Sequence, residues 1–422
     1  MNAYRRESIL RFYILGFICL LIFLRGSLYW PRWLTIDSLT SPAWQLLGAW
    51  SILTLAISYM LIKDGSGHPF LKIFLKQRTL IIFVIFCMLS ILWSVSPGAS
   101  EYRVLLLIFA TLTGAYLGFQ YDPDRILNIL FWFGIATVTL CYMAILYNPS
   151  LAIMNFIPYN GAWRGIFWHR NYLGQIMALF NVLFLILAID KFKSSKNLSY
   201  LAGIFYILSL VLIVKAKSAA GYIICILLHG SVVLSVIWIR LSSLLKPAHY
   251  FTGFIVIAIA AITVFLNLDV LLGLFNRNPS LTGRVPLWGE LLDVIQQRPW
   301  FGYGFGAIWT IEEFRTSLQQ TLGWLYPVVI ADNGFLDILL HVGVIGFALF
   351  LTIWLLTWIR SFQHILQHRR LSDFFPLIFM LFTLLGNISF SFFMETESFI
   401  WMTLVAFLIA LKPVKEKILR GI

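Results

Sequence analysis

Charged side chains are scarce in this sequence. Lysine, arginine, aspartate and glutamate make up 12% of the 422 residues, whereas 60% are hydrophobic. That leaves too few polar groups to cover the surface of a soluble domain, so a soluble fold is excluded. The apolar stretches run on without regular polar alternation, which also excludes a transmembrane β-barrel. The sequence therefore predicts an all-α polytopic membrane protein.

The motifs of several enzyme classes are missing as well. The four cysteines all lie inside apolar stretches, where cysteine is typical of a small core hydrophobe rather than of a disulfide or a metal site. The sequence contains no Walker loop, no glycine fingerprint for a dinucleotide and no His/Cys cluster with zinc spacing. We therefore expect any chemistry to proceed without ATP, cofactor or metal.

Long apolar stretches predict about twelve membrane spans within one integral membrane domain, residues 1–422. A spanning helix needs about 20 apolar residues, and the N-terminal stretch is too long for a signal-peptide core, so we expect a retained helix there. The predicted spans cover roughly residues 9–29, 43–62, 79–94, 103–119, 126–147, 172–189, 198–214, 219–239, 250–272, 333–359, 374–391 and 396–411.

The distribution of lysine and arginine predicts the orientation. Placing the N-terminus in the cytoplasm puts 20 of the 31 lysines and arginines in inner loops, as the positive-inside rule requires, and leaves both termini cytoplasmic. The net charge of +13 then indicates topology and contact with anionic lipid rather than nucleic-acid binding. The only long outer segment, residues 273–332, is predicted to be an ordered periplasmic cap against the membrane.

Five cations at or beyond the outer ends of spans oppose this orientation signal. Charged helix ends can simply reach lipid phosphates, and that alternative stays open. However, arginine grips phosphate with paired hydrogen bonds, and His169 adds a further donor beside two of the arginines. These cations therefore predict a bound anion; they are Arg164, Arg170, Lys215, Lys217 and Arg284.

The predicted cap contains a candidate amphipathic helix over residues 283–297. Trp288, Leu291, Leu292 and Ile295 recur at helical spacing and predict one apolar face in the membrane interface. Arg284 lies in its first turn, and a helix N-terminus beside an arginine is suited to an anion.

Carboxylates near the same surface are candidates for a base. Asp332 is the first of them, although either it or Asn333 could instead be an N-cap. Asp337 and His341 are four residues apart on one helix face and are expected to satisfy each other. Glu395 and Glu397, in a predicted outer turn, are further candidates.

Taken together, five segments resemble the O-antigen ligase and polymerase superfamily, and within it the exopolysaccharide-production branch. The resemblance implies a GT-C-like fold with twelve spans in the bacterial inner membrane. It also implies transfer of a glycan from a polyprenyl (usually undecaprenyl) pyrophosphate to an acceptor hydroxyl on the outer face, without a metal. The segments are ILWSVSPGASEYRVLLL (91–107), GAWRGIFWHRNYLGQ (161–175), LTGRVPLW (281–288), RPWFGYGFGAIW (298–309) and ADNGFLDILLHVGVIG (331–346).

The resemblance also suggests residue roles. Arg284 matches the family arginine of the T-G-R segment, and Lys215 or Lys217 matches a basic group at an earlier outer turn; both would hold the pyrophosphate. Ligases carry a His-Asn pair where this chain has Asp332 and Asn333. A carboxylate, with an ordinary pKa near ~4, is a weaker base than histidine unless burial raises it.

The resulting hypothesis is an inverting displacement at the anomeric carbon of the donor. Lys215, Lys217 and Arg284, with Arg164 and Arg170 nearby, would neutralise the departing pyrophosphate, and Asp332 would accept the acceptor's proton. The expected partners are the lipid-linked donor, a glycan or glycolipid acceptor, membrane lipid and other polysaccharide-assembly proteins. Two alternatives stay open, a bicarbonate-like anion transporter and a non-catalytic assembly component, and the sequence does not separate ligase from polymerase.

Overall fold

The structure is a computed structural model. It describes residues 44–155, 159–192, 194–241, 284–323, 328–394 and 399–411, and a few isolated positions between 249 and 263. The predicted spans 9–29 and 250–272 lie essentially outside these residues.

The described part of the chain is a helical bundle with one two-stranded sheet, in which β1 pairs antiparallel with β2. The elements before the cap are α3 (Trp44–Lys63), α4 (Gly67–Leu75), α5 (Arg78–Leu89), η1 (Ser90–Trp93), α6 (Pro97–Gln120), α7 (Pro123–Tyr147), α8 (Pro149–Ala152), β1 (Ile153–Met154), β2 (Ala162–Trp163), α9 (Arg170–Lys191), α10 (Lys196–Ala216) and α11 (Ala219–Leu241). Those that follow are α14 (Arg284–Gln297), η2 (Ile308–Thr310), α15 (Glu312–Leu322), α16 (Gly334–Gln367), η3 (Leu371–Phe374), α17 (Phe375–Ser389), η4 (Phe392–Met394) and α18 (Phe399–Ala410).

The all-α polytopic class predicted from the sequence is confirmed. Seven helices of the described residues are long and apolar enough to cross a membrane, or eight if the sharply bent pair α3–α4 forms one span. The predicted spans near α5 and α18 correspond to shorter apolar helices. The total of twelve spans stays a prediction.

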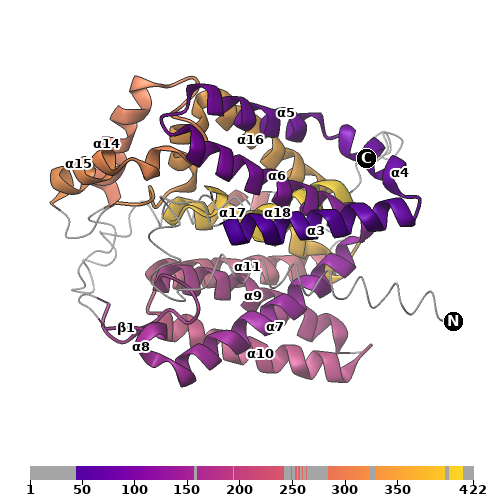
Figure 1. Ribbon diagram of the computed structural model, residues 1–422. Coiled ribbons are helices and arrows are strands. Elements are labelled where there is room, and N and C mark those ends of the chain that lie inside the picture. Colours follow the sequence, from indigo (N-terminus) through magenta and orange to yellow (C-terminus); the bar gives the residue numbers. More distant parts are fainter. Residues whose placement is uncertain are drawn as a thin grey trace.

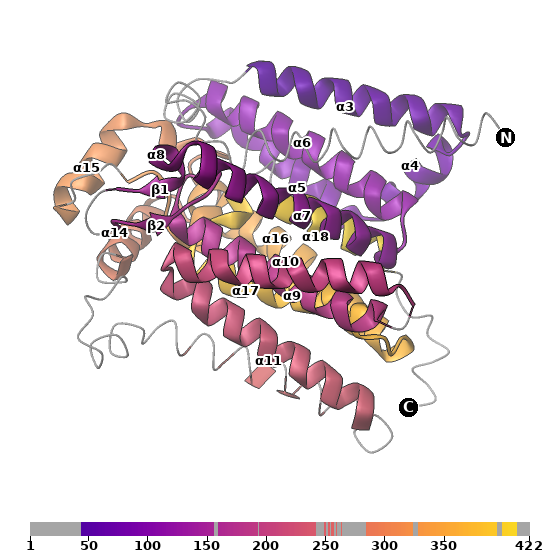
Figure 2. The same cartoon turned by 90° about the horizontal axis from the view of Figure 1, so that it is seen from below.

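Small residues bring the central helices close together. Helices α9, α17 and α18 lie in the middle of the bundle, with α3 and α11 on its outside (Figures 1 and 2). On α6, Gly114 and Gly118 face the backbone of α18, where a Cβ at Gly114 would lie 2.6 Å from the Met402 carbonyl oxygen. Small residues at such a spacing allow two membrane helices to approach and gain van der Waals contact. Any side chain at either glycine would push α6 away from the core.

One end of the bundle gathers the segments that sequence analysis singled out. Both views place α8, β1, α14 and α15 at the same end (Figures 1 and 2). Helix α9 starts at this end, the turn between α10 and α11 lies there, and α16 begins there, because these helices run alternately up and down the bundle. This end is called the cap end below.

Helix α16 is interrupted near the cap end. Gly343 has a φ of 63° inside the helix, a left-handed conformation that glycine adopts at little cost. The carbonyls freed by the break accept from the glycine-rich segment that follows α14: Tyr303 N–H donates to the Leu340 oxygen at 2.8 Å and Gly304 N–H to the His341 oxygen at 3.0 Å. Backbone groups at membrane depth must be satisfied within the protein, so this pairing fixes the segment carrying α14 onto α16.

Candidate functional site

Helix α14 forms as predicted, from Arg284 to Gln297, but its buried face differs from the prediction. Leu287, Leu291 and Ile295 are buried against Leu340 of α16, whereas Leu292 is 47% exposed. The predicted apolar face is rotated about the helix axis relative to the buried one, in which the residues follow each other at intervals of four and so lie along one side of the helix. Helix α14 therefore packs on protein along this stripe, and Trp288 is only partly buried at its edge.

Arg284 and Asp332 form an ion pair at the cap end. The Arg284 Nε donates to Asp332 Oδ2 at 3.2 Å, and their side chains are 10% and 28% exposed. Asp332 has a left-handed backbone, with a φ of 50°, and non-glycine residues in that conformation are frequent at functional sites. The cap of α16 is its neighbour Asn333, whose side chain accepts from the N–H of Phe335 and of Leu336. Asp332 is thus not the N-cap.

The peptide groups of Ala331 are held from two sides, just before Asp332. Trp288 of α14 donates from its Nε1 to the Ala331 oxygen at 3.0 Å, and the Ala331 N–H donates to Asp337 Oδ2 at 3.3 Å. Trp288 lies one turn after Arg284 on the same helix, so α14 binds both the backbone of Ala331 and the carboxylate of Asp332. These contacts orient Asp332 toward Arg284.

Asp337 has partners other than the predicted one. It is 1% exposed and accepts from Trp309 Nε1 at 2.7 Å as well as from Ala331, while His341 Nδ1 accepts from the Gly306 N–H at 3.2 Å. The expectation that Asp337 and His341 satisfy each other is therefore wrong. His341 instead accepts a hydrogen bond from the glycine-rich segment, and Asp337 accepts hydrogen bonds from Trp309 and from the loop before α16. Asp337 organises the loop that carries Asp332.

Replacing Asp337 by alanine is expected to destabilise the protein by roughly 2–6 kcal/mol, because two buried N–H donors lose their acceptor at about 1–3 kcal/mol each. Thermal unfolding followed by tryptophan fluorescence in detergent measures the change. Asp293→Ala, at an exposed position of α14, is the matched control. Equal unfolding temperatures for the two variants would contradict the role given to Asp337.

Arg164, directly after β2, and Arg170, the first residue of α9, border the same end. Arg164 is 8% exposed and donates from Nε to the Leu151 oxygen at 2.6 Å. Arg170 donates to the Lys217 carbonyl oxygen, and its guanidinium carbon lies 4.5 Å from the centre of the Tyr159 ring. Arg170 thereby joins the first turn of α9 to the turn between α10 and α11.

Lys215 and Lys217 are both exposed. Lys217 ends α10 in a left-handed conformation, and its Nζ donates to the Asn160 oxygen at 3.3 Å. The Nζ of Lys215 lies 5.7 Å from the centre of the Trp163 ring, within cation–π range. The two lysines thus face the loop around β2, and Lys217 is the one joined to Arg170.

This turn is held tightly against α9. Ser218 donates to Asn171 Oδ1 at 3.0 Å, and Gly174 meets Gly221, where a Cβ would lie 2.9 Å from the Gly174 carbonyl carbon. The close approach of two glycines lets the cationic turn sit directly over the start of α9.

His169 lies among three of the arginines and is kept neutral by burial and by their charges. Burial, together with the charges of Arg170, Arg284 and Arg164, lowers the pKa of His169 to about 3. Its Nδ1 accepts from the Asn171 N–H at 3.2 Å, which assigns the proton to Nε2. His169 is therefore a neutral hydrogen-bond donor, and its surroundings are electrically positive.

The lowered pKa of His169 predicts a pH-dependent stability. Between pH ~6.5 and pH 3 the unfolded chain binds a proton here that the folded protein does not, so stability contributed by neutral His169 is lost as the pH falls through that window. In His169→Gln this loss is absent, and the unfolding temperature should fall less than that of the wild type between pH 7 and pH 4. Parallel pH profiles of the two proteins would show that His169 does not carry the shift.

The structure brings together most of the predicted site and adds residues that the sequence did not indicate. Glu395 and Glu397 lie outside the described residues. Trp288 was predicted only as an apolar residue of α14, and Trp309 and Ala331 lie in segments that carry the resemblance but were given no role of their own. The hydrogen bonds of Trp288 to Ala331 and of Trp309 to Asp337 join residues 43 and 28 apart, and such contacts leave no local pattern. Ser218 and Asn171 were likewise visible only as polar residues beside cations.

Residues 204–351 match the family model described as O-antigen ligase, a segment that includes Lys215, Lys217, Arg284 and Asp332. The chain is also similar to the exopolysaccharide production protein ExoQ of Rhizobium meliloti (strain 1021), with 23% identity over 305 residues. That alignment covers 68% of this chain and 66% of the relative, just under two thirds of its length. The resemblance of this polytopic membrane protein to the O-antigen ligase superfamily, predicted from its motifs, is therefore confirmed.

Proposed function

We propose that this protein is a membrane glycosyltransferase of the O-antigen ligase or polymerase type. It transfers a glycan from a polyprenyl pyrophosphate, such as the undecaprenyl form, to an acceptor hydroxyl at the cap end, on the outer face of the inner membrane. The observation that carries the proposal is the Arg284–Asp332 pair beside a neutral His169, with Arg164 and Arg170 close enough to lower its pKa. This arrangement joins an anion site to a candidate base.

The cations suit a departing pyrophosphate. Asp332 accepts a hydrogen bond from the Nε of Arg284. In the described part of the chain, the two terminal nitrogens of Arg284 have no hydrogen-bond partner. Those nitrogens can bind a second anion while Nε keeps its carboxylate, since guanidinium presents five donors in a rigid fork. His169 adds a donor without adding charge. Stabilisation of developing charge by such preorganised groups is commonly the largest single contribution to catalysis.

The proposed reaction is one displacement. The acceptor oxygen forms a bond to the anomeric carbon while the bond from that carbon to the phosphate oxygen breaks, with inversion. The pair of electrons leaves with the lipid pyrophosphate, where Arg284, Lys217 and the neighbouring cations receive the charge. The acceptor's proton passes to Asp332, so charge and atoms balance without a further reactant.

Reconstitution of the purified protein tests the proposal. The protein in liposomes is given a polyprenyl-pyrophosphate glycan and candidate acceptors, with and without EDTA, and glycosylated product and released lipid pyrophosphate are measured. We expect turnover in EDTA. Turnover only with added divalent metal would contradict the metal-independent mechanism. Bicarbonate flux without glycosylated product would favour a transporter. The absence of both glycan transfer and bicarbonate flux would favour a non-catalytic role in polysaccharide assembly.

Analysis of lipid-linked intermediates after gene deletion separates the two reaction types. Accumulated single repeat units indicate a polymerase, because chain extension fails. Accumulated full-length lipid-linked polymer indicates a ligase, because only the final transfer fails.

A further inference from the structure

A cavity of about 550 Å³ lies at the opposite end of the bundle, far from Arg284. Its wall comes from three segments that are distant in sequence: the end of α9, the end of α11 and the turn that leads into η3. The residues that line it are Ile189, Asp190, Lys191, Ser194, Val236, Ile239, Arg240, Arg369, Arg370, Leu371 and Ser372.

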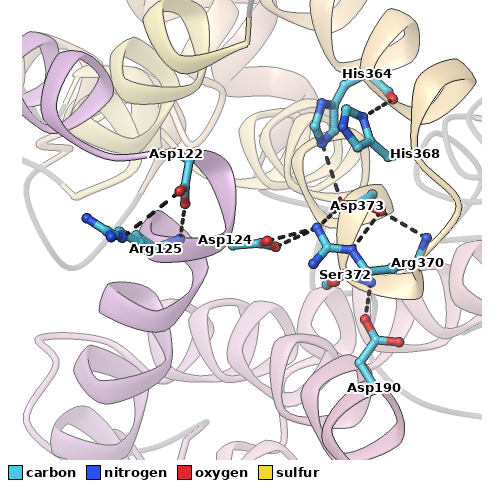
Figure 3. A network of polar contacts seen from close by, with 9 residues as sticks. All are labelled: Asp122, Asp124, Arg125, Asp190, His364, His368, Arg370, Ser372 and Asp373. Atoms are coloured by element: carbon cyan, nitrogen blue, oxygen red, sulfur yellow. Dashed lines mark hydrogen bonds and ion pairs between the residues drawn. The ribbon is translucent and has the colours of Figure 1, made fainter. Parts of the chain in front are cut away.

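Most of the charge in this cavity is positive. Four of its residues are cations and one, Asp190, is an anion. The Asp190 carboxylate accepts from the Ser372 N–H at 2.6 Å, and Figure 3 shows it directed at this turn. This hydrogen bond positions Asp190 on the wall of the cavity, and since the backbone N–H is neutral, the carboxylate still offsets one of the four positive charges.

Arg370 is also occupied. It donates to Asp373 at 2.7 Å and forms an ion pair with Asp124 at 2.8 Å, and these carboxylates raise the pKa of Arg370. Figure 3 shows Arg370 between the two acids. This network fixes the turn that carries Arg369 against α7 and leaves Arg370 as a structural cation.

Lys191 and Arg240 differ from Arg370. Within the described part of the chain, neither side chain has a hydrogen bond or an ion pair, yet both line the cavity. Two like charges kept on one concave wall repel each other unless an anion lies between them. The positive charge of Lys191 and Arg240 therefore favours the binding of an anionic ligand in the cavity.

The apolar half of the wall indicates what kind of anion this is. Ile189, Val236 and Ile239 lie on α9 and α11, which are membrane-span candidates by length and composition, and Ile189 is 49% exposed. A free phosphate ion gains nothing from such a surface, whereas an acyl chain buries against it. We propose that this cavity binds the phosphate headgroup of an anionic phospholipid, with its acyl chain along α9 and α11. The proposal is independent of the site at the cap end.

Lipid retention by the purified full chain tests the site. Native mass spectrometry measures how much phosphatidylglycerol and phosphatidylcholine remain bound, and a parallel titration with inorganic phosphate asks whether a free ion suffices. Each cation near a headgroup contributes about 1 kcal/mol, so the double variant Lys191→Gln/Arg240→Gln should weaken phosphatidylglycerol binding roughly 10- to 30-fold. Phosphatidylcholine binding should change little.

The control variant also loses two positive charges at the same end of the bundle, but outside the cavity. Lys72→Gln/Lys76→Gln changes two exposed lysines on and just after α4, away from the cavity, and should retain phosphatidylglycerol like the wild type. If both double variants lost phosphatidylglycerol binding equally, the effect would come from surface charge in general, and the proposal would be overturned. Saturation by inorganic phosphate with displacement of the lipid would overturn it as well, in favour of a free anion. Far-UV circular dichroism of both variants checks that they are folded.

Discussion

Arg284→Ala is expected to lower glycan transfer by about 10²- to 10³-fold, the loss typical of removing one preorganised donor from a developing anion. Arg284 is buried, begins α14 and reaches Asp332 with a single nitrogen, so the substitution removes the proposed pyrophosphate donors and leaves the α14 packing stripe intact. The measurement is the initial rate of product formation in liposomes at saturating donor.

Two further variants sharpen this result. Arg284→Lys keeps the charge but not the planar fork, and should recover only part of the activity. Arg298→Ala removes an exposed arginine just beyond the other end of α14, where it stacks on Tyr303 at 5.0 Å, and should keep nearly full activity. Full activity in Arg284→Ala, or an equal loss in Arg298→Ala, would show that Arg284 does not hold the leaving group.

Asp332→Asn is expected to lower turnover by about 10²- to 10⁴-fold, the range typical of general base removal. Asparagine matches aspartate in size and tolerates the left-handed backbone, so the loop held by Trp288 and Asp337 should stay in place. The donor should still bind with nearly wild-type affinity, because the cations are unchanged. Unimpaired turnover in this variant would assign Asp332 a structural role as partner of Arg284.

Asp332→His provides the complementary test, since the resemblance implies histidine at this position in ligases. A base works only when deprotonated, so activity is lost as the pH falls through its pKa. Histidine titrates near ~6.5 and aspartate near ~3.9 in model peptides, so the variant should be active and its acid limb should move to higher pH than in the wild type. An unchanged pH profile would mean that residue 332 does not accept the proton.

The sequence by itself determined the class of this protein and the positions of several of its long apolar helices. Apolar stretches predicted α9, α10 and α11 within a few residues of their bounds, because a membrane leaves a chain few ways to satisfy its backbone other than a helix. The five cations could also be singled out in the sequence, because they lie at or beyond the outer ends of spans and so oppose the positive-inside rule.

Only the tertiary structure decided how these residues are combined. Asp332 and Asn333 are neighbours with identical sequence signals for a cap, and the contact with Arg284 across 48 residues separates the ion-pair partner from the cap. The same holds for Asp337, whose sequence neighbour His341 proved less important than Trp309 and Ala331.

The physical reason is the range of the interactions. Hydrophobic length and helix periodicity are local, so they can be read from a stretch of about twenty residues. Hydrogen bonds and ion pairs act over about 3 Å between groups that the fold brings together, so they depend on how α14, α16 and the turn between α10 and α11 pack. The cations were therefore evident in the sequence, whereas their arrangement around His169 and Asp332 was decided by packing.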